Sequence, residues 1–303
     1  MNRRRFLGTS ALAVAAAAIP TGAAEMPTLL VLGGTNFLGR AVVAAALGLG
    51  HKVTLFNRAK SHPGLFPQAE HLRGDRNGDL TSLEGRNFDW VIDTSGQRPS
   101  QVRATPRMLS SSRYLYVSSI SAYADKSTHG LHEMSPLVQP GPDEELEKEE
   151  MITYGERKVR CEQITRESMG ELALIVRPCL IVGPHDITDR FTYWPMRFAQ
   201  GGRILAPGTP DDPIQWVDVR DLALFMLVLL NLGATGIYNG VGPAKAGTIG
   251  QLMQVCADVC GAPCEVVWVP SQELEKFQVS AWQDMPTWVP PLGESAGFVR
   301  VDN

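Results

Sequence analysis

Residues 29–40, LLVLGGTNFLGR, decide the fold. The stretch begins with four apolar residues, continues through Gly33-Gly34, and ends in a segment whose apolar residues have helical spacing. With a second strand predicted over residues 51–56, this is the order of a βαβ unit. Because a helix start exposes unpaired N–H groups and the positive end of the helix dipole, the turn predicts a dinucleotide site. The alternative is a strand, turn and helix that bind no ligand.

The glycine spacing of this turn departs from the usual pattern at one position. Gly33 and Gly39 fit it, but Asn36 stands where a middle glycine is expected. Asparagine tolerates a positive φ better than other non-glycine residues, so we expect the turn to survive the replacement. The residues expected at the cofactor phosphates are Gly33, Thr35, Asn36, Phe37, Leu38 and Gly39.

The end of the second strand bears on the choice of cofactor. An Asp or Glu there would hydrogen-bond the ribose hydroxyls of NAD, but the strand HKVTLFNR ends in Asn57-Arg58. An arginine can pair with a 2′-phosphate through two charged hydrogen bonds. The sequence therefore favours NADP. NAD stays open, because a solvated arginine after a strand is an ordinary feature.

Predicted strands and helices alternate along the rest of the chain, which is typical of a parallel sheet. We expect further strands over residues 71–76, 88–93, 114–117, 172–177, 215–219 and 236–240. Helices are expected over residues 99–111, 144–169, 221–232 and 248–260. The predicted fold class is α/β: a doubly wound, Rossmann-like parallel sheet with a smaller C-terminal substrate lobe.

Ligands of doubly wound sheets bind beyond the carboxyl ends of the strands. Asp75 and Arg76 form the polar tip of the third predicted strand, where Asp75 is placed to meet an adenine edge. Thr94, Ser95 and Gly96 follow the fourth. We expect these five residues to contact the cofactor.

Length and composition fit one large α/β domain with a lobe, since the 303 residues are 44% hydrophobic and 20% charged. We expect residues 25–180 to form the dinucleotide-binding core and residues 181–303 mainly the substrate lobe, with Gln215–Gly240 returning to the core. The formal net charge is −4 and no basic run occurs outside the N-terminus, so nucleic acid is not an expected partner. The cysteines and histidines show no convincing metal-ligand spacing, and no metal is expected.

Residues 1–24 resemble a twin-arginine export signal. Arg3-Arg4-Arg5 precedes an alanine-rich apolar stretch, and Gly22-Ala23-Ala24 offers a small-residue cleavage pattern. The apolar stretch is too short for a comfortable membrane span. Export to the periplasm or cell exterior is therefore expected, with no membrane span after signal removal. The alternative is that Met26 is the true start and the protein is cytoplasmic.

A serine, a tyrosine and a lysine carry the catalytic chemistry. YGERK at residues 154–158 places Tyr154 and Lys158 four residues apart, on one face of a helix. A tyrosine is ordinarily a poor base, with a pKa of about 10, but a nearby ammonium and an oxidised nicotinamide favour the phenolate. With a serine hydroxyl on the substrate oxygen, such a set shuttles a proton in alcohol–ketone interconversion. The Tyr-x-x-x-Lys spacing is common by chance, yet of the six tyrosines only Tyr154 has it.

Together these motifs make the sequence resemble the short-chain dehydrogenase/reductase superfamily, specifically its extended branch, the NAD-dependent epimerase/dehydratase family. The resemblance spans residues 29–301. It rests on GGTNFLGR (33–40), GDR (74–76), DTSG (93–96), YVSSISAY (116–123), YGERK (154–158), RPCLIVGP (177–184) and WVDVRDLA (216–223). The GGTxFLG form resembles a bacterial reductase-like subgroup, and some relatives with that turn, such as the chloroplast stem-loop binding proteins, bind RNA.

The resemblance implies roles for individual residues. Ser119 would polarise the substrate, with Ser118 the less favoured choice. Tyr154 would be the acid/base, Lys158 would assist it and bind the nicotinamide ribose, and Pro178 would pack beside the nicotinamide. These roles imply an NAD(P)-dependent oxidoreductase or epimerase/dehydratase that transfers a hydride at a carbinol or carbonyl carbon of a small molecule, for example a nucleotide sugar.

Substrate and alternative functions are less determined. Arg190 and Arg197 could clamp a phosphate or carboxylate of the substrate, although surface arginines on an irregular helix are the plainer interpretation. The chain could instead be a non-catalytic NAD(P)-binding sensor, or an RNA-binding or scaffold relative. The intact serine, tyrosine and lysine and the acidic net charge argue against these. A homodimer stays open.

Overall fold

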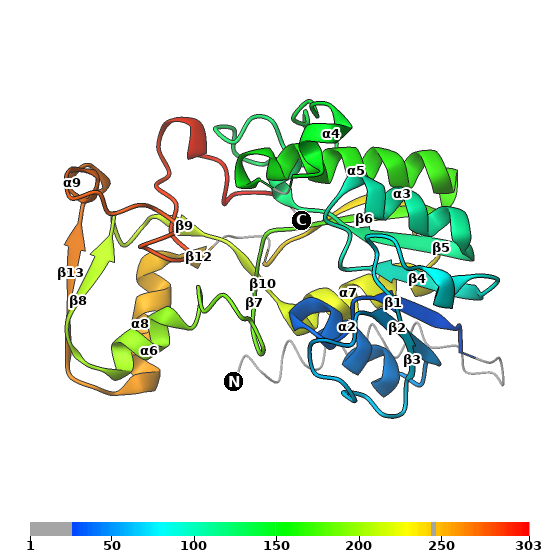
Figure 1. Cartoon of the computed structure of the whole chain (residues 1–303). Helices are drawn as coiled ribbons and strands as arrows, with labels where there is room; N and C mark the ends of the chain where they lie inside the picture. The colour runs from blue at the N-terminus through cyan, green and yellow to red at the C-terminus, as the bar shows by residue number, and fades with distance from the viewer. Residues whose placement is uncertain (1–25, 149, 244–246, 303) are drawn as a thin grey trace.

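The computed structural model describes residues 26–148, 150–243 and 247–302. The export signal expected over residues 1–24 lies outside the described residues. Those described form an α/β core with a smaller lobe beside it (Figure 1). Within these ranges, no helix combines the length and the apolar character needed to cross a lipid bilayer.

A seven-stranded parallel sheet forms the core, in the order β11-β6-β5-β4-β1-β2-β3. The strands are β1 (Leu29–Leu32), β2 (Val53–Asn57), β3 (Glu70–Arg73), β4 (Asn87–Asp93), β5 (Ser110–Val117), β6 (Ala173–Pro178) and β11 (Gly236–Gly240). All four residues of β1 are buried, as expected for a central strand covered on both faces. The strand order reverses between β1 and β4, where such sheets bind their ligands. The predicted doubly wound α/β fold is confirmed.

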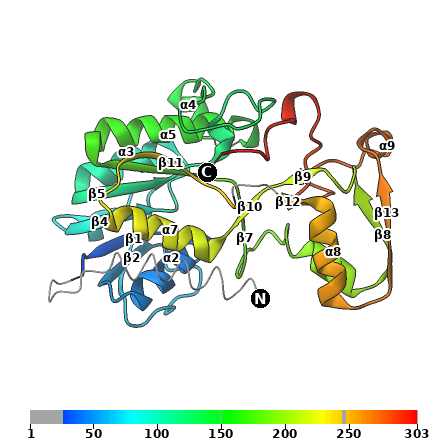
Figure 2. The ribbon, with the colours of Figure 1, turned by 180° about the vertical axis from the view of Figure 1, so that it is seen from behind.

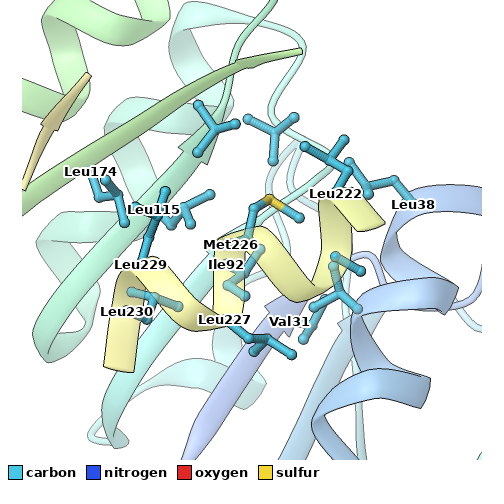
Figure 3. Close-up of a cluster of buried hydrophobic side chains, with 14 of the residues drawn as sticks. Val31, Leu38, Ile92, Leu115, Leu174, Leu222, Met226, Leu227, Leu229 and Leu230 are labelled. Atoms are coloured by element: carbon cyan, nitrogen blue, oxygen red, sulfur yellow. The ribbon is translucent and has the colours of Figure 1, made fainter. Parts of the chain in front are cut away.

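Helices cover both faces of this sheet. The two helices α2 (Phe37–Gly48) and α7 (Val219–Asn231) lie on one face, and α3 (Pro99–Met108) and α5 (Tyr154–Met169) on the other (Figures 1 and 2). Figure 3 shows Met226 of α7 beside Ile92 of the sheet and Leu229 of α7 beside Leu115, all in one buried cluster. This packing keeps the strand ends near the glycine turn in a fixed arrangement.

Two predicted helices have different ends in the structure. Helix α3 ends at Met108 rather than Ser111, because Leu109 is extended (φ −105°, ψ 130°) and the next residue already pairs in β5. The helix expected over residues 144–169 is divided into α4 (Asp143–Leu146) and α5. Tyr154 is therefore the first residue of a helix instead of an interior one.

The lobe is built from short strand pairs and helices. Its elements are α6 (Tyr193–Ala199), β8 (Gly202–Pro207), β9 (Pro213–Ile214), β12 (Gly247–Thr248), α8 (Ile249–Cys260), β13 (Cys264–Val269) and α9 (Ser271–Lys276). Strand β8 pairs with β13, and β9 with β12. A further pair, β7 (Leu180–Val182) with β10 (Trp216–Asp218), lies between lobe and core (Figures 1 and 2). Of the segment 215–240, α7 packs on the sheet and β11 pairs with β6.

Candidate functional site

A cleft of about 520 Å³ lies at the glycine turn, beyond the carboxyl ends of β1, β2 and β4. The predicted cofactor residues that line it are Gly33, Thr35, Asn36, Phe37, Leu38, Gly39, Asn57, Arg58, Asp75, Arg76, Thr94 and Ser95. The lining does not include the predicted residues of the nicotinamide end, which are Gly96, Ser119, Tyr154, Lys158 and Pro178. Gln97 and Arg98 line the cleft as well, and no sequence signal beyond their place after DTSG marks them.

The glycines of the turn leave room that a side chain would fill. Gly33 has φ +111°, and a Cβ there would lie 2.7 Å from Thr94 Oγ1. A Cβ on Gly39 would lie 2.6 Å from the backbone nitrogen of Gly34, so the start of α2 can approach the turn only without one. These are the demands of a backbone that closes tightly around a pyrophosphate, and the residues present fit such a group.

Asn36 works differently from the prediction. Its backbone is extended (φ −119°, ψ 145°) at the N-cap of α2, so the position does not require a positive φ. The residue that takes the positive φ is Phe37, at +30°. Asn36 makes no side-chain hydrogen bond to the first helical turn, which also contains no acidic residue. The N–H groups at the start of α2 are therefore left to a ligand.

Asn57 and Arg58 have separate places at the end of β2. Asn57 Nδ2 donates to the carbonyl oxygen of Gly33 (3.3 Å), and its Oδ1 accepts from the N–H of Ala59 (2.7 Å), so it ties the strand end to the glycine turn. Arg58 is exposed at the cleft. A 2′-phosphate there would meet a solvated guanidinium that can turn toward it.

Arg76 is held by the protein although its residue borders the cleft. Its guanidinium donates to Asp93 Oδ1 (2.5 Å), to the carbonyl oxygen of Gln101 (2.8 Å) and to Thr105 Oγ1 (3.1 Å). Asp93 is fully buried, so this ion pair offsets the desolvation of both charges. Arg76 was predicted to contact the cofactor; the residue lines the cleft, while its guanidinium is held by groups of the core. Asp75 stays at the cleft, where its Oδ1 accepts from the N–H of Asn77.

The two adjacent serines after β5 have different partners. Ser118 Oγ donates to Glu162 Oε1 (2.5 Å) inside the core. Ser119 Oγ accepts from the N–H of Ser121 (3.1 Å) at the start of a short 3-10 helix. The Ser119 hydroxyl proton can therefore be donated to a substrate oxygen, whereas that of Ser118 is engaged.

Lys158 is buried beneath this turn, with 4% of its surface exposed. Its Nζ donates to the carbonyl oxygen of Val117 (3.0 Å), to Tyr116 Oη (3.2 Å) and to the carbonyl oxygen of Gly96 (3.4 Å). Gly96 is thus a link between β4 and the lysine, because Tyr116 Oη also donates to its carbonyl (3.0 Å). Tyr116 was not among the predicted site residues.

Tyr154 opens α5 and is half-buried. Lys158 Nζ lies 5.8 Å from the centre of its ring. The helix start approaches the turn formed by residues 118–121, here called the serine turn. This approach requires a glycine at position 155, because a Cβ there would lie 2.3 Å from the carbonyl oxygen of Ser121. The close approach at Gly155 therefore places the first turn of α5, which begins with Tyr154, against the serine turn.

The remaining predicted residues lie away from the cleft lining. Pro178 is buried at the end of β6, where it pairs with Gly240 of β11. Arg190 contacts Thr188 Oγ1 (3.0 Å) and lies over the ring of Trp282 (5.0 Å). Arg197 donates to the carbonyl oxygens that follow α6, those of Gly201 (2.9 Å) and Arg203. Within the described residues, no group of three or more His, Cys, Asp or Glu could hold a metal ion.

A buried ion pair supports the serine turn, and sequence reasoning missed it. Arg177, fully buried on β6, pairs with Glu162 of α5 (2.6 Å), the carboxylate that also accepts from Ser118. Arg177 Nη1 reaches the carbonyl oxygen of Glu133, and Glu133 Oε1 accepts from the N–H of Asn239 (2.8 Å). RPCLIVGP displays the arginine, but nothing in YGERK indicates its carboxylate partner further along the helix.

Comparisons with known proteins agree with this arrangement. The model of the NAD dependent epimerase/dehydratase family matches residues 99–240. The chloroplast stem-loop binding protein of 41 kDa b from Arabidopsis thaliana is 29% identical over 269 residues, which cover 81% of this chain and 66% of that protein. The chain thus spans slightly less than two thirds of this relative's length.

Solved structures share the fold at low identity. UDP-N-acetylglucosamine 4-epimerase from Bacillus cereus superposes with a TM-score of 0.61 at 18% identity, over 81% of this chain and 86% of that one. UDP-glucuronic acid 4-epimerase from Bacillus cereus in complex with NAD gives 0.63 at 15% identity, over 90% and 97%. The family match begins at α3 and includes Ser119, Tyr154 and Lys158 but not the glycine turn. The solved structures thus share the fold of this chain, and the family match covers the part of it that carries the serine, tyrosine and lysine.

Proposed function

We propose that this chain is a member of the NAD-dependent epimerase/dehydratase family and works as an NAD(P)-dependent oxidoreductase or epimerase/dehydratase. The observation that carries the proposal is the joining of α5 to the serine turn. Gly155 seats the helix start against Ser121, two residues after Ser119, and the buried Lys158 of the same helix lies 5.8 Å from the centre of the Tyr154 ring. The glycine turn beside them fits a dinucleotide.

The proposed chemistry is the oxidation of a carbinol or its reverse. When bound, the nicotinamide ring supplies the acceptor or donor of the hydride. Ser119 Oγ donates a hydrogen bond to the substrate oxygen. The Tyr154 phenolate takes the hydroxyl proton as the carbinol C–H bond breaks, and a carbonyl results. In the reverse direction the phenol returns that proton. Lys158 favours the phenolate by its charge.

The proposed substrate is a small molecule with a hydroxyl or carbonyl group, and a nucleotide sugar is the first class to screen. The two Bacillus cereus structures with this fold are named for UDP-sugar epimerases. The lobe would set which substrate is taken, since site and fold fix only the reaction type.

NADP is the proposed preferred cofactor. Arg58 and Lys60 are exposed at the cleft, and Asp75 is the one acidic residue in its lining. A carboxylate that would bind the ribose hydroxyls of NAD and repel a 2′-phosphate is missing at the end of β2, where Asn57 stands. NAD remains the alternative cofactor, because one solved structure with this fold is named as a complex with NAD.

The test uses the chain from Glu25 onward, titrated with NADPH and NADH while nicotinamide fluorescence is followed. We expect NADPH to bind at least about tenfold more tightly, and Arg58→Ala to remove most of that preference, because a charged hydrogen bond is worth roughly 1.5–3 kcal/mol. Tyr154→Phe should keep NADPH affinity and lose turnover across a nucleotide-sugar panel. Absence of binding by either nucleotide, or full turnover by Tyr154→Phe, contradicts the proposal.

One observation favours a second candidate function. The curated relative at 29% identity is a stem-loop binding protein, so a non-catalytic NAD(P)-binding sensor or an RNA-binding or scaffold protein is the alternative. A protein of this alternative kind would keep its binding function in the Tyr154→Phe variant. The net charge of −4 disfavours a nucleic-acid partner.

We also propose export by the twin-arginine route for a chain that begins with residues 1–24. That route carries folded proteins, often with their cofactor bound. A periplasm holds no evident NADP pool, so an exported protein would need to bind its cofactor before export.

A further inference from the structure

Lys158 has a complete set of acceptors inside the protein. An ammonium has three donors, and Nζ contacts three oxygens at 3.0, 3.2 and 3.4 Å. Two belong to backbone carbonyls, those of Val117 and Gly96. The third is the hydroxyl of Tyr116, so this is the contact a substitution can remove.

Tyr116 holds the ammonium in two ways. Its hydroxyl accepts from Nζ while donating to the carbonyl oxygen of Gly96, and Nζ lies 5.0 Å from the centre of its ring. Burial raises the pKa of Tyr116 well above its usual value, so the hydroxyl keeps the proton that it donates. The side chain is completely buried and has no alternative position in water.

The carbonyl shared by Tyr116 and Lys158 is itself fixed. The N–H of Gly96 donates to Asp93 Oδ1 (2.8 Å), and Asp93 is paired with Arg76. A Cβ on Gly96 would lie 2.8 Å from Asp93 Oδ2 and 3.1 Å from the ring of Tyr116, so these groups close on the glycine from two sides. The ammonium therefore lies in a closely packed site whose acceptors are themselves hydrogen-bonded.

We propose that Tyr116 is a positioning residue, which fixes the Lys158 ammonium beneath Tyr154 and so sets the pH range in which Tyr154 can accept a proton. The inference rests on the proposed function, in which the lysine charge favours the Tyr154 phenolate. Without the Tyr116 hydroxyl, Lys158 keeps two acceptors in a dry site. The charged form of the lysine is then less favoured, and the phenolate loses part of its support.

Other charged or titratable groups face the same space. They are Tyr154, Arg157 and Cys161 of α5, Tyr114 and Tyr116 of β5, Asp93 of β4, and Arg76 after β3. Burial raises the pKa of the Cys161 thiol to about 11, so it is neutral in the physiological range. Asp93 is already paired with Arg76. A change at Tyr116 thus acts on Tyr154 through Lys158.

The test follows ionisation of Tyr154 in the full chain by ultraviolet phenolate absorbance, as the difference between each protein and its Tyr154→Phe counterpart. We expect Tyr116→Phe to move the midpoint to higher pH, on the order of half a pH unit or more. The matched control is Tyr114→Phe. Tyr114 is equally buried on the same face of β5, and its hydroxyl donates to Asp93 (2.8 Å) instead of contacting Lys158. It should lose stability without moving the midpoint.

A second comparison separates positioning from a general loss of structure. In a Lys158→Met background, Tyr116→Phe should leave the midpoint where Lys158→Met alone puts it. An unchanged midpoint in Tyr116→Phe, equal shifts in both tyrosine variants, or a further shift without the lysine would each overturn the inference. Failure of the proposed function is a separate result: it is full turnover by Tyr154→Phe, which this titration does not measure.

Discussion

At the scale of single residues, two neighbouring serines have different roles: Ser118 bonds within the core, and Ser119 is the proposed substrate contact. Ser118 completes a buried group with Glu162 and Arg177, whereas Ser119 meets only a backbone N–H at the start of a turn. The resemblance placed the substrate contact on Ser119 and gave Ser118 as the lesser choice. The hydrogen bonds supply a physical reason for that order, because a hydroxyl that already donates to a buried carboxylate has no proton for a ligand.

The two alanine variants should separate these roles. Ser119→Ala removes a hydrogen bond to a backbone N–H, so we expect it to lower the free energy of unfolding by about 1 kcal/mol, whereas Ser118→Ala removes one to a buried carboxylate and should cost about 1.5–3 kcal/mol. Ser119→Ala should also lower turnover about 100-fold with NADPH affinity unchanged, since it removes a donor to the reacting oxygen. Turnover and nucleotide affinity would be measured beside urea unfolding. Turnover that falls more in Ser118→Ala than in Ser119→Ala would contradict the assignment.

The sequence predicts the contacts of a side chain poorly when its partner lies on a different strand. Arg76 was predicted at the cofactor from its place after β3, whereas its ion pair with Asp93, the last residue of β4, forms only in the folded sheet. The same limit hid Tyr116, which reads as an ordinary apolar position within YLYV. Asn36 was interpreted through its tolerance of positive φ, while the chain assigns that geometry to Phe37.

At the scale of elements, the strands of the central sheet were predicted, whereas β7, β8, β9, β12 and β13 were not. The sequence predicts β1, β4, β6 and β11 within about two residues, because buried parallel strands are continuous apolar runs between polar turns. Helix ends were less predictable. The segment expected to form one helix over 144–169 is divided before Tyr154, and the close approach of Gly155 to Ser121 at the start of α5 is a tertiary contact that local propensity does not contain.

Gly155 gives this contact a test. In Gly155→Ala the new Cβ would lie 2.3 Å from the carbonyl oxygen of Ser121, so the start of α5 must move. We expect a loss of about 1–3 kcal/mol of stability and about 100-fold in turnover, because a displacement of roughly 1 Å misplaces Tyr154. Gly48→Ala is the control, since Gly48 ends α2 and a Cβ there meets nothing within 4 Å. Equal effects in both variants would show that the close approach is unimportant.

At the scale of the whole molecule, the last described residues join lobe, core and site loop. The C-terminal segment runs from the lobe to the core (Figures 1 and 2). There Val301 bridges to Leu131, in the loop between Ser119 and Tyr154, and the carbonyl oxygen of Asp302 accepts from Asn239 of β11 (3.0 Å). Gln215, beside β10, bonds both backbone groups of Val301, at 2.8 and 3.1 Å. One buried amide thus connects the segment before β10 to the C-terminal segment, which bridges to the loop between Ser119 and Tyr154.

Removing that amide should loosen the loop as well as the terminus. Gln215→Leu leaves the buried N–H and C=O of Val301 without their partner, so we expect a loss of about 2–4 kcal/mol in unfolding free energy. Hydrogen exchange should rise at the N–H of Gly130 and of Asp302, which bond across the same junction. Gln254→Leu is the control, because Gln254 is exposed and bonds within α8, and its loss should stay below about 0.5 kcal/mol. If Gln215→Leu lowers stability while exchange at Gly130 stays at the wild-type rate, the terminus is anchored independently of the loop and the coupling fails.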